Sequence, residues 1–359
     1  MSISHSFWNN RQVLVTGHTG FKGSWLSLWL SNLGADVSGI ALNPPTSPNL
    51  FDLARIQDSM SHNKILDIRN RMDVHDAVSE IAPEIIFHLA AQPLVRQSYS
   101  DPVETYETNI MGLVHLFEAI RHTPSVKTVI IVTTDKCYDN REWVWGYRES
   151  DALGGRDPYS SSKGCAEIVA HAYRSSFLAN NGVAVATARA GNVIGGGDWA
   201  QDRLIPDILS SIAKGIPPLI RYPDAIRPWQ HVLDPLNGYL ALAEQLSNNN
   251  SLCGAWNFGP DNADCLTVAE VTETLLELYG TDITWTSDQE DTHHEARFLK
   301  LDCAKASSLL KWRPQWSCKQ TLSAVVDWHK KYLAGNHPEE LCMDQIHRFS
   351  QQPAKGLQI

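Results

Sequence analysis

Apolar runs and helical periods alternate through the first half of the chain. Short runs rich in Val, Ile and Leu are typical of buried strands, and each is followed by a segment with the three- to four-residue apolar spacing of a helix. This alternation predicts an α/β protein with a doubly wound parallel sheet. The predicted strands are 12–16, 36–42, 64–66, 84–89, 128–133 and 184–189. The predicted helices are 23–33, 72–81, 103–122 and 159–180.

The alternation weakens after residue 190, where prolines interrupt the pattern. A short helix near 205–213, a helix over 231–246, a strand over 255–258 and a last helical stretch from 267 to about 333 are expected there. We therefore predict a Rossmann-type domain with a smaller, discontinuous, mostly α C-terminal substrate lobe. The domain covers 1–190 with a return segment at about 228–260, the lobe covers 191–227 and 261–335, and 336–359 forms a loosely held polar tail.

Composition narrows the class of protein. The 359 residues are 43% hydrophobic, which is enough for one large core, and 30 basic against 40 acidic residues give a net charge of −10. That balance argues against a nucleic-acid partner. No apolar run approaches the roughly 20 residues that span a bilayer, and the opening residues have no signal-peptide pattern, so we expect no membrane partner and a cytoplasmic location.

Cysteine and histidine spacings do not indicate a metal site. The seven cysteines are widely spread without a Cys-x-x-Cys pair, and we expect them to be reduced thiols. His293-His294-Glu295 resembles a chelating cluster, but consecutive side chains point in different directions and no third ligand lies at chelating spacing. The prediction is therefore that the protein binds no metal.

A glycine-rich loop follows the first predicted strand. Glycines at 17, 20 and 23 in Gly17-His-Thr-Gly-Phe-Lys-Gly23 permit a tight turn, close approach of the backbone to a pyrophosphate, and close packing of the next helix. This predicts a dinucleotide site. The end of the second strand offers neither an Asp or Glu for ribose hydroxyls nor an Arg for a 2′-phosphate, so this segment leaves NAD and NADP open.

Two further segments predict acid/base chemistry. Tyr159 and Lys163 lie four apart and share one face of a predicted helix, so the lysine charge is expected to lower the pKa of the phenol toward neutrality. Thr134 and Asp135 follow the end of a predicted strand, where ligands bind in such sheets. A tyrosinate beside a nucleotide loop indicates a hydride-transfer site with extra acid/base groups.

Seven motifs occur together in order and carry a family resemblance. They resemble the extended short-chain dehydrogenase/reductase family, and more narrowly its nucleotide-sugar 4,6-dehydratases, over about 12–302. The motifs are Gly17-x-x-Gly20-Phe21-x-Gly23, His88-Leu-Ala-Ala-Gln92, Thr108-Asn109-x-x-Gly112, Thr134-Asp135, Tyr159-x-x-x-Lys163, Arg189-x-Gly-Asn192-Val and Arg227-Pro-Trp229.

The resemblance implies NAD as cofactor and assigns the site residues. The implied catalytic residues are Thr134, Asp135, Lys136, Tyr159 and Lys163. The implied cofactor contacts are Gly17, Thr19, Gly20, Phe21, Lys22, Gly23, Asp67, Ile68, Leu89, Ala90, Ala91, Asn109 and Thr133, together with Tyr159 and Lys163. The implied substrate contacts are Arg96, Asn192, Arg203, Leu204, Arg227 and Asn257.

The family's chemistry gives each catalytic residue a role. Tyrosinate 159, helped by Thr134, would remove the proton of the sugar 4-hydroxyl during oxidation at C4, and Asp135 would protonate the departing C6 hydroxyl. Most of the group has a glutamate next, as the base at C5, whereas this chain has Lys136. Lys136 is then either the base, or an electrostatic partner of the enolate while water or another carboxylate takes the proton, or an ion-pair partner of Asp135.

Within the group, 17–25 and 134–146 resemble the enzymes that act on CDP-glucose, which feed dideoxyhexose and lipopolysaccharide O-antigen synthesis. CDP-glucose is thus the implied substrate, although residue chemistry alone does not select cytosine. A nucleotide-sugar 4-epimerase, a dehydratase for another nucleotide hexose and a non-catalytic dinucleotide sensor are the alternatives. Asp135 argues against epimerisation, and the Tyr159/Lys163 pair argues against a sensor. The family also implies a homodimer through a four-helix bundle formed by 103–122 and 159–180, with a tetramer possible.

Overall fold

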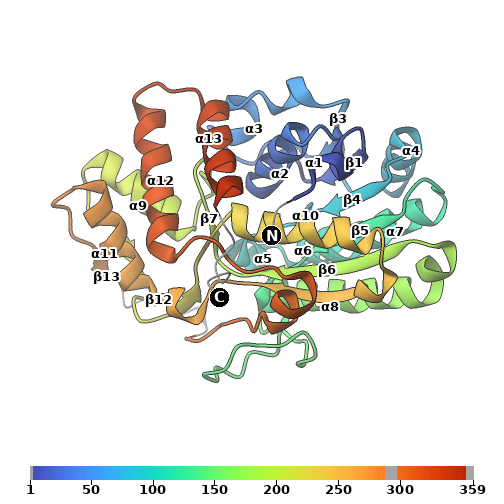
Figure 1. The fold of residues 1–359 in the computed structure, drawn as a ribbon. Helices are drawn as coiled ribbons and strands as arrows, with labels where there is room; N and C mark the ends of the chain where they lie inside the picture. Colours follow the sequence, from blue (N-terminus) through green and yellow to red (C-terminus); the bar gives the residue numbers. More distant parts are fainter. Residues whose placement is uncertain (1–2, 288–296, 353–359) are drawn as a thin grey trace, which may run out of the picture.

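The central sheet is parallel and doubly wound. In a computed structural model, residues 3–287 and 297–352 are described, and within them seven strands form one sheet in the order β11-β6-β5-β4-β1-β2-β3 (Figure 1). Every neighbouring pair is parallel. The strands are β1 (Gln12–Thr16), β2 (Asp36–Ala41), β3 (His62–Ile65), β4 (Ile85–His88), β5 (Thr128–Val132), β6 (Ala184–Ala190) and β11 (Gly254–Phe258). The predicted fold class is confirmed, with strand ends shifted by one or two residues.

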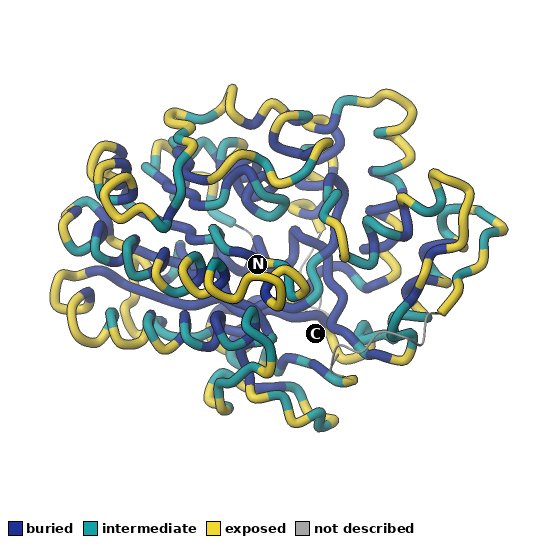
Figure 2. Tube along the Cα trace, turned by 180° about the vertical axis from the view of Figure 1, so that it is seen from behind, coloured by how far each residue is buried: buried dark blue, intermediate teal, exposed yellow. Residues whose placement is uncertain are grey.

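Helices cover both faces of the sheet. One face carries α2 (Phe21–Asn32) and α10 (Leu233–Leu246), and the other carries α4 (Arg71–Ile81), α7 (Gly112–Arg121) and α8 (Pro158–Tyr173). Burial on both faces explains why the inner strands read as continuous apolar runs in the sequence, whereas the edge strand β3 is polar and largely exposed. Figure 2 shows these buried strands in dark blue beneath the exposed outer surfaces of the helices.

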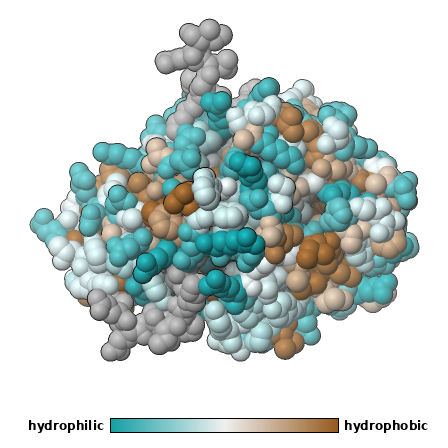
Figure 3. Space-filling view, turned by 90° about the horizontal axis from the view of Figure 1, so that it is seen from below, coloured by the Kyte–Doolittle hydropathy of each residue, from teal (hydrophilic) through white to brown (hydrophobic). Residues whose placement is uncertain are grey.

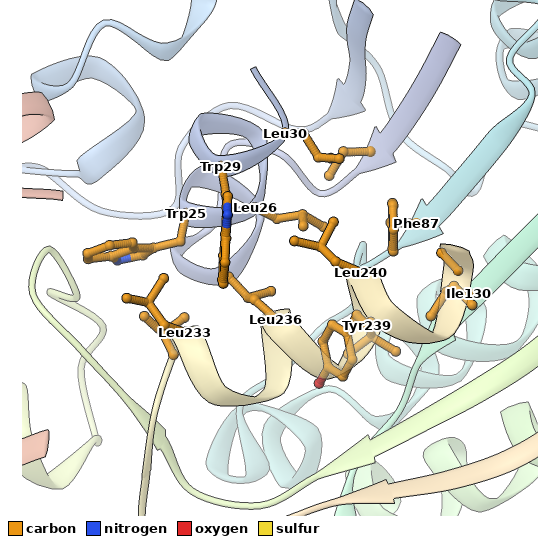
Figure 4. Close-up of a cluster of buried hydrophobic side chains, with 14 of the residues drawn as sticks. Trp25, Leu26, Trp29, Leu30, Phe87, Ile130, Leu233, Leu236, Tyr239 and Leu240 are labelled. Carbon is orange, nitrogen blue, oxygen red and sulfur yellow. The ribbon is translucent and has the colours of Figure 1, made fainter. Parts of the chain in front are cut away.

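The larger core lies between the sheet and the pair α2 and α10. Leu26 and Trp29 of α2 face Leu240 and Leu236 of α10, with Phe87 of β4 close to Leu240 (Figure 4). All of these side chains are at most 2% exposed. Burying large apolar side chains at this density is the main source of the stability of the fold.

Two predicted helices contain short changes of pitch. The predicted helix 103–122 consists of α6 (Pro102–Tyr106), a π-helical turn η2 (Glu107–Met111) and α7. The predicted helix 159–180 consists of α8, a π-helical turn η4 (Arg174–Leu178) and a 3₁₀ turn η5 (Ala179–Asn181). The remaining short helices before them are α1 (His5–Trp8), α3 (Leu50–Leu53), η1 (Ile56–Ser59), α5 (Val95–Ser100) and η3 (Asp135–Cys137).

The C-terminal half returns to the sheet once and then forms the lobe. Strand β11 pairs with β6, as the predicted return segment requires. The lobe packs α9 (Leu204–Lys214), α11 (Val268–Tyr279) and α12 (Cys318–Leu333) around its own apolar cluster. Its small strands and turns are β7 (Val193–Ile194), β8 (Leu219–Ile220), β9 (Ile226–Pro228), β10 (Gln230–His231), β12 (Cys265–Thr267), β13 (Thr286–Ser287), η6 (Asn250–Leu252), η7 (Asn262–Asp264) and η8 (Ala306–Leu310).

The prediction of a loosely held tail is wrong for the part of it that the structure describes. Residues Pro338–Gln351 form a helix, α13, whose Leu341, Ile346 and Phe349 are buried in the larger core. The ring of Phe349 lies 5.8 Å from that of Trp29, edge to face. The signal was present in the sequence, because Cys342, Ile346 and Phe349 recur with the three- to four-residue spacing of one helix face. Across the described residues, no helix is long and apolar enough to cross a membrane.

Candidate active site

A cleft of about 380 Å³ opens at the carboxyl ends of the strands, between the sheet and the lobe. Most of the predicted catalytic and substrate residues line it, although they come from distant parts of the chain. These are Arg96, Thr134, Asp135, Lys136, Tyr159, Asn192, Arg203, Leu204 and Arg227, and two predicted cofactor contacts, Lys22 and Thr133, line the cleft as well. The structure therefore brings together residues that the sequence separates by up to 205 positions.

The glycine loop forms a close-packed turn beside the cleft. Gly17 has φ +75°, and a Cβ atom placed there would lie 2.7 Å from the backbone nitrogen of Ala90. A Cβ atom at Gly23 would lie 2.1 Å from the carbonyl oxygen of Gly17. Both positions exclude a side chain, and α2 begins at Phe21 with Gly20 as its N-cap, so its first amides are open to an anion. This turn fits the pyrophosphate of a dinucleotide.

Hydrogen bonds hold the neighbouring strand ends in place. The hydroxyl of Thr16 bonds with His88 Nδ1 at 2.8 Å and accepts from the amide of Ala90 at 3.1 Å. Asn109 accepts from the amide of Gln92 at 2.8 Å and donates to its carbonyl at 3.1 Å. Asn109 thus fixes the path of the segment that includes Leu89, Ala90 and Ala91, next to the glycine turn.

Asp67 and Ile68, which were predicted to contact the adenine, lie after β3 with different surroundings. The carboxylate of Asp67 is held by Arg69, whose Nη2 lies 2.6 Å away, so Arg69 accompanies Asp67 at the end of β3. Ile68 is buried and packs against Gly112. Thr19 donates to the carbonyl of Leu42 at 2.8 Å and ties the glycine loop to the end of β2. Neither Asp67 nor Ile68 lines the cleft, so their contacts with a cofactor remain predictions.

Tyr159 and Thr134 meet at the reacting end of the cleft. Burial raises the pKa of Tyr159 to about 12, and a hydrogen bond with the side chain of Thr134 opposes that rise. The sequence predicted that the pKa of Tyr159 would fall toward neutrality. In the chain alone the pKa rises instead, because desolvation outweighs the favourable contacts. The shared contact does place both hydroxyl groups where a single sugar oxygen can reach them.

Asp135 is a buried carboxyl group with one uncommitted oxygen. Its side chain is 3% exposed, and burial raises its pKa against the opposing charge of Lys136. Oδ1 accepts from the hydroxyl of Thr134 at 3.0 Å, whereas Oδ2 has no hydrogen-bond partner among the described residues. A carboxyl group with a raised pKa and a free oxygen on a cleft suits a general acid.

Two lysines are buried near this end. Burial lowers the pKa of Lys163 to about 8, while the charge of Glu167 raises it, and its Nζ donates to the carbonyl of Val132 at 3.3 Å. Burial also lowers the pKa of Lys22 to about 8, with the charges of Arg203 and Lys163 acting in the same direction. Predicted as a cofactor contact, Lys22 lies in the wall of the cleft itself.

Sequence reasoning missed Glu167, which supports the catalytic residues from below. Its carboxylate accepts from the hydroxyls of Thr133 at 2.5 Å and Thr187 at 2.6 Å, and it forms a two-atom contact with Arg189 at 3.0 and 2.8 Å. Arg189 also donates to the hydroxyl of Tyr138 at 2.8 Å. The signal was available, because Glu167 is four residues after Lys163 on one helix face.

The predicted substrate residues divide into those on the cleft and one elsewhere. Arg203 donates to Asp198 at 3.1 Å, and Arg96 lies 3.8 Å from Asp202. Both arginines are half-exposed on the cleft wall, where they can reach a diphosphate. Asn257 is instead fully buried on β11, and its side chain donates to the carbonyls of Tyr147 and Asp302. The structure does not bring Asn257 to the cleft.

The described residues contain no group of three or more His, Cys, Asp or Glu side chains that could hold a metal ion. His293, His294 and Glu295 lie outside the described residues.

A family model and a sequence relative show which family the chain belongs to. The family model described as GDP-mannose 4,6 dehydratase matches residues 14–325. CDP-glucose 4,6-dehydratase of Salmonella typhimurium (strain LT2) is 53% identical over 339 residues, which are 93% of this chain and 94% of that protein.

Solved structures share the fold. That of dTDP-glucose 4,6-dehydratase from Bacillus anthracis in complex with NAD has a TM-score of 0.75 and 25% identity, covering 91% of this chain and 99% of its own. That of UDP-glucuronic acid 4-epimerase from Bacillus cereus has a TM-score of 0.78 at 24% identity, covering 89% and 99%, and so shows the fold alone. By the family model and the 53% identity, the chain belongs to the nucleotide-sugar 4,6-dehydratase family that the GDP-mannose 4,6 dehydratase model describes.

Proposed function

We propose that this chain is an NAD-dependent CDP-glucose 4,6-dehydratase, a hydro-lyase that converts CDP-glucose to CDP-4-dehydro-6-deoxyglucose. The observation that carries the proposal is the meeting of Thr134, Asp135 and Tyr159 in one cleft of a chain 53% identical to an enzyme of that name. The dehydration leaves the cofactor in its starting redox state. Such a product suits the synthesis of dideoxyhexoses for surface polysaccharide.

The fit of the cofactor rests on the glycine turn. Gly17, Gly20 and Gly23 would hold the pyrophosphate, and Tyr159 with Lys163 would face the nicotinamide half. When bound, NAD would supply an oxidised nicotinamide that takes a hydride from C4, returns it to C6, and favours tyrosinate 159 by its positive charge. The chain itself contributes Lys163, one helical turn from Tyr159, as a second positive charge.

Proton transfers at C4 and C6 belong to side chains on the cleft. Tyrosinate 159 removes the proton of the C4 hydroxyl, and Thr134 hydrogen-bonds the same oxygen as a ketone forms. The ketone acidifies the proton at C5. Protonated Asp135 then donates to the C6 hydroxyl, which leaves as water, and its raised pKa keeps that proton available.

The base at C5 is the open step of this mechanism. Lys136 lines the cleft, and its charge opposes the raised pKa of Asp135. The three roles considered for it are base, enolate stabiliser and partner of Asp135. Exchange of the C5 hydrogen with deuterated solvent separates them in Lys136→Met, since a base is required for exchange, a stabiliser only speeds it, and a partner of Asp135 leaves it unchanged.

One incubation tests the proposed function against its alternatives. The purified protein is offered CDP-, dTDP-, UDP- and GDP-hexoses with NAD, and each product is weighed by mass spectrometry. The proposal expects loss of one water from CDP-glucose. A 4-epimerase would give a product of unchanged mass, a dehydratase for another sugar nucleotide would spare CDP-glucose, and a sensor would convert none of them.

The assembly is proposed to be a homodimer, with a tetramer as the alternative. Exposed apolar side chains on the two helices of the expected four-helix bundle support it. They are Val103, Tyr106 and Met111 on the first helix and Ile168 and Phe177 on the second. Figure 3 shows apolar side chains gathered in a patch on the face seen from below. A cytoplasmic location is also proposed, and the seven cysteines, all unpaired, are consistent with it.

A further inference from the structure

Charged residues form two sets along the cleft, one around Lys22 and one around Asp207, and the two sets share one member. The charges that act on the pKa of Lys22 are those of Arg203, Lys163, Asp135 and Asp198, which mark the reacting end. Those that act on Asp207 are the charges of Asp202, Arg221, Asp198 and Arg96. Asp198 belongs to both sets and pairs with Arg203, so this pair lies between the two ends.

A sugar nucleotide fits this arrangement in one direction. With the hexose at Tyr159, the diphosphate would lie beside Arg203 and the nucleoside would lie near Asp207, since all three residues line the same cleft and Asp207 is in the first turn of α9. The wall there is apolar, as the two faces of a base require. Its apolar members are Leu204, Pro206, Ile208, Pro218, Leu219 and Ile220.

Asp207 is an acidic residue in this wall whose carboxyl group is not used in contacts within the described residues. It lines the cleft from the first turn of α9, and among the described residues no hydrogen bond or ion pair is found for its carboxyl group. The other two acids of the set around Asp207 are engaged, Asp198 with Arg203 and Asp202 with Arg221. Burial raises the pKa of Asp207 to about 6, which leaves it mostly ionised at neutral pH.

The pyrimidine bases differ at the ring edge that such a carboxylate can read. Cytosine presents a 4-amino donor, whereas uracil and thymine present an oxygen acceptor at that position. A carboxylate accepts from the amino group and is repelled by the oxygen. Facing the uracil N3–H instead would place the charge between two carbonyl oxygens, which is also unfavourable.

We propose that Asp207 selects the nucleobase, by accepting a hydrogen bond from the 4-amino group of cytosine and rejecting the 4-oxygen of uracil and thymine. The inference rests on the proposed function for the presence of a nucleotide sugar in the cleft. It supplies the residue that distinguishes cytosine, which the sequence alone did not indicate. Asp207 is a specificity residue and takes no part in the chemistry at the hexose.

The test is Asp207→Asn, because the amide keeps the size and adds a donor that can reach the 4-oxygen. The ratio of kcat/KM for CDP-glucose to that for UDP-glucose should fall about 10- to 100-fold, which is the range expected for one hydrogen bond to a charged group. Asp207→Ala should weaken CDP-glucose without improving UDP-glucose. The matched control is Asp224→Asn, an exposed acid in the loop between β8 and β9 that is outside the lining of the cleft.

Binding of CDP and UDP alone, measured by calorimetry, separates this inference from the function. A wild-type preference for CDP that Asp207→Asn removes would support the inference even if CDP-glucose were not dehydrated. Dehydration of CDP-glucose by a variant that keeps the wild-type preference for CDP over UDP would overturn the inference and leave the function standing. Loss of preference in the Asp224→Asn control as well would also overturn it, since the effect would then be general to the lobe.

Discussion

Two regions of the cleft use the same kinds of charged residue in opposite ways. They are the floor, which is the layer of Glu167 and Arg189 beneath the reacting end, and the far wall, which carries Arg203 and Arg221. On the floor, Glu167 and Arg189 are 3–4% exposed and form a contact at 2.8 Å that also engages two threonine hydroxyls. On the wall, Arg203 and Arg221 are 33% and 28% exposed, and their ion pairs are 3.1 and 3.3 Å long. Buried, fully bonded charges hold geometry, whereas half-exposed pairs exchange partners at little cost.

This difference matches what each region must do. In the proposed mechanism, the floor positions Thr134 and Tyr159 for proton transfer, where small displacements reduce the rate strongly. If Arg203 binds the diphosphate, as proposed, its ion pair with Asp198 must open when the substrate enters and close again afterwards. Substitutions on the floor should therefore reduce turnover or stability, while those on the wall should change affinity.

The largest effect is expected from Tyr159→Phe, which removes the base at C4. Turnover should fall about 100- to 10,000-fold, the usual contribution of one acid/base group, while CDP-glucose still binds because only one hydroxyl is lost. Steady-state rates and calorimetric binding measure the two effects separately. Tyr332→Phe, remote from the cleft and stacked on Trp328, is the matched control. Wild-type turnover in Tyr159→Phe would remove this residue from the mechanism.

The next effect is expected from Asp135→Asn, which keeps the shape of the side chain but cannot deliver a proton. Elimination of water should slow about 100-fold or more, and oxidation at C4 should slow less. Reduced cofactor, seen by its absorbance, and a 4-keto hexose that keeps its C6 hydroxyl should then accumulate. An equal loss in both steps would show that Asp135 orients the substrate and does not act as the acid.

The reacting end of the cleft was largely predictable from the sequence, whereas Glu167 on the floor and Asp207 in the wall were not. Gly17, Thr134 and Tyr159 belong to local patterns whose spacing fixes their placement at strand ends or on a helix face. Asp207 lies on the predicted short helix, whose period alone does not show which face borders the cleft, and Asp198 and Arg203 lie on the irregular segment before that helix. Helix α13 was missed although its apolar residues have helical spacing, and the sequence does not show that Phe349 packs against distant Trp29.

A smaller loss of activity and a clear loss of stability are expected from Glu167→Gln. The variant leaves Arg189 buried without its counter-charge, which should lower the free energy of unfolding by about 3–5 kcal/mol. Glu167 also raises the pKa of Lys163, so without it that pKa falls below about 8 and the alkaline limb of the activity profile should move to lower pH. Thermal unfolding and a pH–rate profile measure both.

The control for Glu167→Gln is Glu80→Gln, which breaks an exposed pair with Lys64. Its unfolding temperature and its pH profile should stay near those of the wild type, since exposed pairs contribute little. If Glu167→Gln unfolds like the control, the floor is not held by this carboxylate. If it loses stability while the alkaline limb stays in place, Glu167 supports the fold without acting on Lys163.

The smallest effect is expected on the wall, from Arg203→Ala. The arginine is predicted to bind the diphosphate, so its loss should raise KM about tenfold, the lower end for a hydrogen bond to a charged group, and leave kcat within a few-fold. Stability should change little, because the side chain is 33% exposed and its pair with Asp198 is accessible to water. Arg203→Lys should recover part of the affinity, since it keeps the charge and loses the planar two-point contact. Steady-state kinetics with CDP-glucose provide both constants. A fall in kcat with unchanged KM would mean that Arg203 acts at the reacting end through Lys22, and the contrast between floor and wall would then fail at this residue.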